Sequence, residues 1–329
     1  MSKRSERMIR VIELLADGEF HSGQRIGEEI GVSRTAISQY IKDIQALGLD
    51  VFRITGKGYR LSQAIELLDI EQICANQKGS SPAPIKLERI VTSTNDVMRE
   101  RLQNGATFAA GEVLLAEAQT AGRGRRGKQW YSPFATNLYL SMYWPLTQGM
   151  SAAMGLSIVI GTVLAEAVQR AGVPDVALKW PNDVLIKNKK LAGILIDLEG
   201  QAIDDAHAII GVGVNLSMPE WLATPIDQAW TDLQSELNGP LNRNEWVADL
   251  ISHLQEGLIV FEQQGLEPFI QRWLDYDNLF ERNVVLTMGQ KTLHGLAKGI
   301  AVDGALLVEI DGNLKHFHAG EVSLRYDSH

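Results

Sequence analysis

The amino-acid sequence predicts an α+β protein of several domains. We expect an N-terminal winged helix-turn-helix, a central mixed β-sheet with helices, and a small C-terminal all-β barrel of the SH3-like kind. Three observations predict these domains. The first part of the chain has helical periodicity that ends in a hairpin pattern, and the middle has strand-like runs with short connections. The last part has short alternating strands between glycine-containing turns. With 329 residues the chain is long enough for two or three domains. We place their boundaries at 1–66, 67–276 and 277–329.

Composition and charge exclude several classes of protein. The chain is 45% hydrophobic and 22% charged, as ordinary soluble globular proteins are. Cys74 is its only cysteine, which excludes an internal disulfide and a cysteine-rich zinc site and fits a reducing, cytoplasmic compartment. The N-terminal stretch is too charged for the core of a signal peptide.

One long stretch without charged residues needs a separate decision about membranes. No Asp, Glu, Lys or Arg occurs from Gln129 to Ala165. Pro145 and Gly149 divide the stretch into pieces that are too short to span a bilayer. We therefore expect a buried strand followed by a buried helix, and no membrane segment.

The first sixty residues have the layout of a winged helix-turn-helix. Isoleucines recur at helical spacing in the segments 8–18, 22–31 and 33–48, and a glycine ends each segment. Ser33 can cap the third helix. The run "VFRITGKGYRL" (51–61) then reads as two short strands around a turn, which resembles a wing.

This unit carries side chains suited to DNA. The polar face of the third helix and the hairpin tip offer groups that reach base edges or phosphates: Ser33, Arg34, Thr35, Ser38, Gln39, Lys42 and Lys57. Residues 1–60 hold ten basic and eight acidic residues, whereas the whole chain has a net charge of −9. DNA binding is the favoured interpretation. A three-helix module that contacts another protein is the alternative.

The middle of the chain alternates between strand-like and helix-like runs. The spacing predicts one break in the last helix, near Gly265 and Pro268. Because several strand connections are short, we expect a mixed or antiparallel sheet with helices packed on one face. The predicted strands cover 112–118, 137–144, 176–180, 183–186, 191–199 and 207–216, and the predicted helices roughly 94–103, 150–171 and 243–275.

The segment "AGRGRRGKQW" (121–130) matches the glycine spacing of a dinucleotide-binding fingerprint. That fingerprint needs a helix opening directly on its last glycine, whereas here Gly127 leads to Pro133 and then to a strand. A P-loop is also excluded, because no Gly-Lys-Ser/Thr follows at the required spacing. What remains is a flexible loop with open backbone N–H groups and three guanidiniums, which suits phosphate or carboxylate. A solvated basic loop without a ligand is the alternative.

Three further polar clusters can converge on this loop: "TSTND" (92–96), "KWPNDVLI" (179–186) and "KNKKLAGILI" (187–196). Each has a simpler explanation, namely helix capping, turn chemistry and a solvated hairpin tip. In the third cluster, strand alternation places Lys190 on the face of Ala192 and Ile194, and Lys189 on that of Asp197. We therefore expect Lys190 to point inward.

Taken together, these segments closely resemble the bifunctional bacterial biotin protein ligases that also repress the biotin operon. The resemblance runs from "HSGQRIGEEIGVSRTAISQYI" to "GEVSLR", with "GRGRRG", "KWPND" and "KLAGIL" as its most specific parts. It implies a catalytic domain of the class II synthetase kind. It also implies two half-reactions: ATP and biotin give biotinyl-5'-AMP and pyrophosphate, and biotin then passes to a lysine of a biotin carboxyl carrier protein.

The resemblance also implies site residues. Arg123, Lys190 and the Mg²⁺ of ATP are the expected partners of the phosphate charge, with no metal held by the protein itself. Asp183 is the candidate that orients or deprotonates the acceptor lysine, with a turn cap as its alternative. The positions implied for binding biotin and the adenylate are Ser93, Thr94, Asn95, Gln119, Gly122, Arg123, Gly124, Arg125, Lys190, Gly193, Asn215, Trp230 and Arg325.

Regulation follows from the same resemblance. The loops at 122–127 and 219–232 are expected to close over the adenylate, which then acts as corepressor. The adenylate-bound protein is expected to form a homodimer on palindromic operator DNA, because one recognition helix reads only a half-site. Two alternatives stay open: a non-catalytic, metabolite-sensing winged-helix repressor, and a lipoyl-type acyltransferase.

Overall fold

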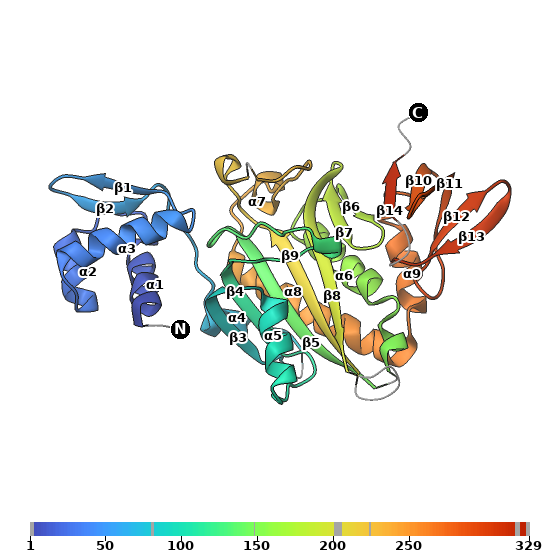
Figure 1. The fold of residues 1–329 in the computed structure, drawn as a ribbon, viewed down its shortest axis with the longest axis horizontal. Coiled ribbons are helices and arrows are strands. Elements are labelled where there is room, and N and C mark those ends of the chain that lie inside the picture. Colours follow the sequence, from blue (N-terminus) through green and yellow to red (C-terminus); the bar gives the residue numbers. More distant parts are fainter. Residues whose placement is uncertain are drawn as a thin grey trace.

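The computed structural model describes residues 3–79, 82–147, 149–200, 206–223 and 225–319, and the backbone of 323–326. Figure 1 shows three units in a row along the long axis of the molecule, each with its own sheet. Within the described ranges, none of the helices combines the length and the apolar character needed to cross a bilayer.

The N-terminal unit is a winged helix-turn-helix, as predicted. Its elements are α1 (Lys3–Leu15), α2 (Gly23–Ile30), α3 (Arg34–Ala46), β1 (Val51–Ile54) and β2 (Gly58–Leu61). The two strands are antiparallel, and the wing gains a bridge from His21 to Tyr59. Ser33 caps α3, since its hydroxyl oxygen accepts a hydrogen bond from the N–H of Ala36 at 3.3 Å.

The central unit contains a seven-stranded mixed sheet in the order β3-β4-β5-β9-β8-β7-β6, in which only β3 and β4 are parallel. Its strands are β3 (Ile85–Val91), β4 (Val113–Gln119), β5 (Asn137–Leu146), β6 (Val176–Lys179), β7 (Asp183–Ile186), β8 (Lys189–Glu199) and β9 (Ala206–Asn215). The six strands that the sequence predicts are β4 to β9. The edge strand β3 was missed, because its charges break the apolar run.

The helices cover both faces of this sheet, so the prediction that they pack on one face is wrong. The helices α6 (Leu156–Arg170) and α8 (Arg243–Gln264) share the main core with one face. On the other face, Met98 of α5 (Thr94–Gln103) packs with Leu114, Tyr143 and Ile209. Strands β4 and β5 are buried at nearly every position, which is typical of strands covered on both sides.

The remaining helices complete the central unit. α4 (Ile70–Asn76), which the sequence interpretation missed, packs against α8 and β3. The short α7 (Leu233–Glu236) follows β9, and α9 (Glu267–Leu274) follows the predicted break after α8. The charge-free stretch forms β5 and then α6, so the expectation of a buried strand and a buried helix is confirmed.

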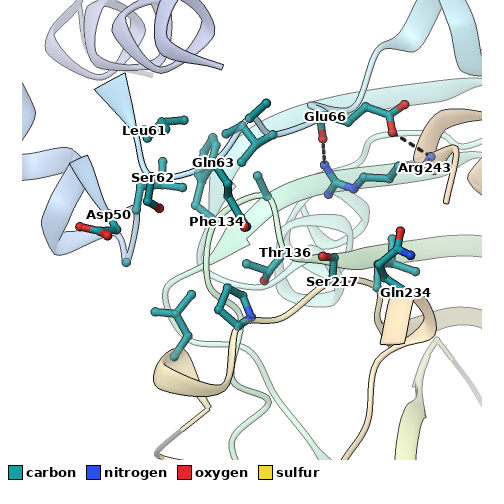
Figure 2. A pocket seen from close by; sticks show the side chains of 18 of the residues that line it. Asp50, Leu61, Ser62, Gln63, Glu66, Phe134, Thr136, Ser217, Gln234 and Arg243 are labelled. Carbon is teal, nitrogen blue, oxygen red and sulfur yellow. Dashed lines mark hydrogen bonds between the residues drawn. The ribbon is translucent and has the colours of Figure 1, made fainter. Parts of the chain in front are cut away.

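The central unit contributes an aromatic side chain to the core of the N-terminal unit. Phe134, which is 1% exposed, belongs to the same hydrophobic cluster as Ile37 and Ile44 of α3. A cavity of about 220 Å³ lies beside it, between the segments 48–50 and 61–66 on one side and the segments around Thr136 and Ser217 on the other (Figure 2). The first two units therefore share packed surface rather than only a linker.

Buried charges hold the connecting segment 62–69 in place. The Glu117 carboxylate is fully buried and is 2.8 Å from Arg243 and 3.1 Å from Arg89. It also accepts a hydrogen bond from the N–H of Leu68. Arg243 donates to the carbonyl oxygen of Glu66 at 2.8 Å, one of the contacts drawn in Figure 2. Because a buried charge is stable only when it is paired, these contacts fix the path of the connecting segment.

The C-terminal unit is a small antiparallel sheet in the order β13-β12-β11-β10-β14. Its strands are β10 (Asn283–Met288), β11 (Lys291–Ile300), β12 (Leu306–Ile310), β13 (Asn313–Phe317) and β14 (Ser323–Tyr326). The all-β prediction is confirmed. Among the described residues, however, β13 and β14 are edges that do not pair, so the sheet is not closed into the expected barrel.

This unit docks on the central sheet beside the turn at 180–182. The N–H of Leu178 donates to Tyr276, and the carbonyl of Leu178 accepts from Asn278. The indole N–H of Trp180 donates to the carbonyl oxygen of Gly304 at 3.0 Å. The C-terminal unit thus reaches the turn that directly precedes the predicted Asp183.

Asp277 lies within this joint, and burial raises its pKa to about 6. A carboxyl with a raised folded pKa binds more protons in the folded state, so its contribution to stability falls as pH rises from about 4 to above 6. Replacing Asp277 with Asn removes this pH-dependent loss in the free energy of unfolding. At roughly 1.4 kcal/mol per pKa unit, the loss is up to about 3 kcal/mol. In calorimetry, Asp277→Asn is expected to raise the unfolding temperature by several degrees at pH 8, by about half as much at pH 5, and little at about pH 4. The exposed Asp275→Asn is the control, and parallel pH curves for wild type and Asp277→Asn would contradict the prediction.

Candidate active site

A cavity of about 450 Å³ lies on the α5 face of the central sheet. It brings together side chains from α5, β4, the glycine loop 122–130, the turn at 180–183 and β8. Ten of the predicted binding or catalytic positions line it: Ser93, Thr94, Asn95, Gln119, Arg123, Gly124, Arg125, Asp183, Lys190 and Gly193.

The other predicted positions lie close by. Asn215 and Trp230 line an adjoining cavity of about 230 Å³, and Trp130 and Lys190 line both cavities. Gly122 is at the base of the glycine loop, where its carbonyl oxygen accepts from the N–H of Trp130 at 2.9 Å. Arg325 pairs with Val285 in the C-terminal sheet, and its side chain lies outside the described part of the structure.

Glycines form the floor of the larger cavity. Gly193, Gly211 and Gly213 lie on neighbouring strands β8 and β9, on the face toward α5. The Trp130 ring lies against this floor, so that a Cβ on Gly213 would be 2.6 Å from it. The sequence interpretation missed Trp130, Gly211 and Gly213. The signal for Gly211 and Gly213 was their strand spacing in "GVGVNL", and this pattern says nothing about Trp130.

The start of α5 builds a polar wall. Thr94 donates from its N–H to the side-chain oxygen of Gln119 at 2.9 Å, and the Gln119 amide donates to Ser132 at 3.0 Å. The hydroxyl of Ser141 lies 2.7 Å from Thr94 Oγ1 and 2.6 Å from Asn95 Oδ1. Ser93 occupies the N-cap position, yet its side chain makes no capping hydrogen bond. Simple helix capping therefore does not explain it.

The glycine loop is a tight hairpin, so part of the backbone N–H groups that were expected to be open are paired within it. The N–H of Gly124 donates to the carbonyl oxygen of Lys128 at 2.7 Å, and Arg123 pairs with Gln129. Arg125 donates to Asn182 Oδ1 at 3.1 Å and to the carbonyl oxygen of Ala319. Arg125 thus joins the loop to the turn before Asp183 and to the C-terminal unit. Burial lowers its pKa, although a guanidinium stays charged at neutral pH.

Arg123 points toward α5 and β8. One of its terminal nitrogens is 2.9 Å from Asp96 and also contacts Asp197. These two carboxylates are partners that the sequence did not reveal. The predicted role of Arg123 on a phosphate stays a prediction.

Lys190 points into the site, as predicted, but not for the predicted reason. Pairing changes from Val184 with Ala192 to Leu185 with Lys190, so Leu191 is the extra residue of a β-bulge. The bulge puts Lys190 on the face of Gly193 and Asp197 instead of the core face of Ala192. Strict alternation was the wrong argument for this strand. The neighbouring Lys189 is exposed.

Lys190 is the cation at the junction of the two cavities. Its Nζ atom is 2.8 Å from Asp183 Oδ1 and 5.5 Å from the centre of the Trp130 ring. Lys179 lines the same cavity, and burial lowers its pKa, with the charges of Lys190 and Lys128 acting in the same direction. This concentration of positive charge around one carboxylate suits a polyphosphate.

The segment with Trp230 is attached directly to Lys190. The N–H of Lys190 donates to Ala229 at 2.9 Å, and the N–H of Thr231 donates to the Lys190 carbonyl at 3.0 Å. The side chain of Asn215 donates to the carbonyl oxygen of Thr231 at 3.0 Å. Asn215 therefore holds Trp230 beside the lysine.

The predicted DNA-contact residues form an accessible surface on α3 and the wing. Arg34, Thr35, Gln39, Lys42 and Lys57 are exposed. Ser38 is half-buried, and its hydroxyl lies 3.1 Å from the Tyr59 hydroxyl, where it fixes α3 against the wing. Ser33 is exposed at the helix cap.

The part of the site that the structure describes offers no ready-made metal centre. In the ranges that the structure describes, no three His, Cys, Asp or Glu side chains gather where they could hold a metal ion. Asp183 faces Lys190 in the cavity.

Comparison with sequence profiles matches three family models to successive segments of the chain. Residues 7–60 match a helix-turn-helix domain, 87–215 the biotin/lipoate A/B protein ligase family, and 279–325 the biotin protein ligase C-terminal domain. The biotin protein ligase of Aquifex aeolicus in complex with biotin and ATP superposes with a TM-score of 0.62 at 25% identity, over 74% of this chain and 99% of that one.

Two curated relatives match over nearly their whole length. The bifunctional ligase/repressor BirA of Salmonella typhimurium is 45% identical over 96% of this chain and 97% of its own. The protein of the same name from Escherichia coli is 44% identical over the same shares. This chain therefore belongs to the family of bifunctional ligase/repressor proteins named BirA.

Proposed function

We propose that this protein activates biotin with ATP to biotinyl-5'-AMP and then transfers biotin to one lysine of a biotin carboxyl carrier protein. The observation that carries the proposal is Lys190 at the junction of two adjoining cavities, one floored by glycines and one lined by Trp230. A two-part ligand with a phosphate at its centre fits this arrangement. The Aquifex relative, which holds biotin and ATP, supports it.

In the first half-reaction a biotin carboxylate oxygen attacks the α-phosphorus of ATP. The bond to the bridging oxygen breaks and pyrophosphate leaves. Two anions must approach each other, so positive charge aimed at the phosphate lowers the barrier. Arg123 and Lys190, the predicted partners of the phosphate charge, line this cavity, and so does Arg125. Mg²⁺ is proposed only as the ATP complex, where it would neutralise phosphate oxygens.

In the second half-reaction the neutral amine of the carrier lysine attacks the acyl carbon, and AMP leaves with the electrons of the acyl–oxygen bond. The amine nitrogen must lose a proton, and Asp183 is proposed to orient the amine or accept that proton. The contact between Asp183 and Lys190 supports a role for Asp183 inside the cavity, rather than the alternative role as a turn cap. Closure of loops 122–127 and 219–232 is proposed to exclude water from the reactive anhydride.

The decisive experiment incubates the full-length protein with ATP, Mg²⁺ and an apo carrier domain, with biotin or lipoate in parallel. Mass spectrometry is expected to show a biotin-sized addition on one carrier lysine and none with lipoate. Biotin-dependent exchange of labelled pyrophosphate into ATP is expected as well. Addition of a lipoyl group would identify a lipoyl-type acyltransferase. Absence of both pyrophosphate exchange and carrier labelling would identify a non-catalytic repressor.

We also propose that the adenylate-bound protein dimerises and represses transcription of the biotin operon from a palindromic operator. Abundant carrier consumes the adenylate, and scarce carrier lets the adenylate-bound form accumulate. This role on DNA and the single cysteine support a cytoplasmic location. Sedimentation velocity at micromolar concentration is expected to show a dimer only with adenylate. Equal sedimentation of both forms would overturn the switch.

Arg34→Ala is expected to weaken operator binding by about tenfold and to lower the salt slope by about one, because it removes one phosphate contact. Arg34 is exposed at the start of α3, where an arginine can reach the DNA backbone. Fluorescence anisotropy with labelled operator at several salt concentrations measures both quantities. Arg101→Ala, on α5 of the central unit, is the charge-matched control. An unchanged slope would favour a protein-contact module.

A further inference from the structure

An ion pair joins the first helix of the N-terminal unit to the edge strand of the central sheet. One terminal nitrogen of Arg89, on β3, lies 3.5 Å from a carboxylate oxygen of Glu13, on α1. The other terminal nitrogen lies 3.1 Å from Glu117 and donates to the carbonyl oxygen of Leu68 at 2.7 Å. Because Glu117 is fully buried, this inner side of the guanidinium is held firmly. Arg89 therefore presents a fixed positive charge to α1.

Both partners of this ion pair are ordered before they meet. A pair of mobile surface side chains contributes little, partly because both side chains lose freedom when they pair. Here Arg89 is held by Glu117, and the Glu13 carboxylate lies 3.1 Å from Arg10 of its own helix. The Arg89 and Glu13 side chains are 20% and 30% exposed, so water screens the pair only in part. The pair can therefore contribute more than an ordinary surface contact.

The ion pair is a second point of attachment beside the connecting segment 62–69. That segment is bonded to both units. The N–H of Ile65 donates to the carbonyl oxygen of Ala16, directly after α1, at 2.9 Å. The N–H of Leu68 donates to the buried Glu117 of the central sheet. One attachment leaves two bodies free to rotate about it, whereas two separate attachments restrict that rotation.

We propose that Glu13 and Arg89 are positioning residues for operator binding, which hold each N-terminal unit in one orientation on its central unit. The adenylate is proposed to bind in the central unit and to control dimerisation, so the contact between two copies depends on that unit. The separation of the two recognition helices then depends on how each N-terminal unit is held. Units held at the separation of the half-sites lose less conformational freedom on DNA. This inference rests on the proposed repressor function.

The test compares full-length Glu13→Gln with wild type, both with biotinyl-5'-AMP bound, on the labelled operator of the biotin operon. The variant is expected to raise the Kd by about fivefold. It is also expected to lose part of the preference for this operator over one lengthened by about two base pairs between the half-sites. Charge alone predicts the opposite change in Kd, because Glu13→Gln removes a negative charge from the DNA-binding unit. An unchanged or lower Kd overturns the proposal.

Glu29→Gln is the matched control. Glu29 lies on α2, 3.2 Å from the same Arg10 that Glu13 contacts, and this ion pair stays within the N-terminal unit. The control removes the same charge from the same unit and is expected to bind the operator as tightly as wild type or more tightly. Biotin-dependent pyrophosphate exchange is expected to be unchanged in both variants. A loss of operator binding in the control equal to that in Glu13→Gln would overturn the role of the cross-unit pair.

A second readout does not depend on DNA. Cys74 is exposed on α4 of the central unit and is the only cysteine of the chain. With Gln24→Cys on the exposed side of α2, two spin labels report the distance between the units by pulsed electron paramagnetic resonance. The distance distribution is expected to be wider in Glu13→Gln and in Arg89→Gln than in the labelled parent, and Glu13→Gln is expected to add nothing to Arg89→Gln. An unchanged distribution in Glu13→Gln overturns the proposal. If wild type does not bind the operator, the repressor function fails, and the distance distribution still decides on the ion pair.

Discussion

Lys190→Ala is expected to lower the rate of biotin adenylation by about 10²–10³-fold. The lysine lies at the junction of the two cavities and is held by Asp183, so its ammonium group is fixed before the phosphate arrives. Charge develops on the departing pyrophosphate in a partly enclosed site, where a fixed cation stabilises the transition state more than water does. Biotin-dependent exchange of pyrophosphate into ATP measures this step alone.

The neighbouring lysine provides the control for that experiment. Lys189 is on the same strand and is exposed, so Lys189→Ala removes the same charge outside the site. Its exchange rate is expected to stay within about twofold of wild type, as for most surface substitutions. Similar losses in both variants would mean that general positive charge, rather than a placed ammonium group, drives the exchange.

Gly213→Val is expected to raise the Kd for biotin by about 100-fold or more. Even the Cβ of an alanine would approach the Trp130 ring to 2.6 Å, and valine adds two methyl groups. Because the floor is a central strand that cannot move away, the indole ring must shift into the cavity. Isothermal titration with biotin measures the loss directly. Gly239→Val is the control, since a Cβ there meets no atom within 4 Å. Tight biotin binding by Gly213→Val would show that the ligand lies elsewhere.

Local patterns were enough to predict the three units and most elements of the sheet. Helical spacing and terminal glycines predicted α1 to α3, and apolar runs predicted β4 to β9. The same runs also held information that the interpretation did not use. Strands as continuously apolar as β5 have no solvated face, and this predicts helices on both sides of the sheet.

The site was harder to predict where it depends on strand register. The inward direction of Lys190 depends on the extra residue Leu191, and no spacing in "KNKKLAGILI" marks a bulge. The glycine floor depends on which residues of β8 and β9 stand side by side, as Gly193 and Gly213 do. Register is a property of paired strands, so single stretches of sequence do not contain it.

Partners from distant parts of the chain were also out of reach. Arg123 meets Asp96 and Asp197, which lie 27 residues before it and 74 residues after it. The basic loop could be recognised as a candidate for binding anions. Only the fold shows that two carboxylates of the same chain, Asp96 and Asp197, lie next to this loop.

Because Phe134 of the central unit packs in the core of the N-terminal unit, the sequences of these two units are expected to change together. Phe134 follows Trp130 by four residues, so one short stretch of sequence both lines the candidate active-site cavity and fills space in the core around α3. In a chimera whose first 66 residues came from a different regulator, the core of the N-terminal unit would have no space shaped for the Phe134 ring. Recombination between a ligase gene and an unrelated repressor gene would therefore rarely give a working hybrid, and the two activities are expected to pass to descendants as a single heritable block.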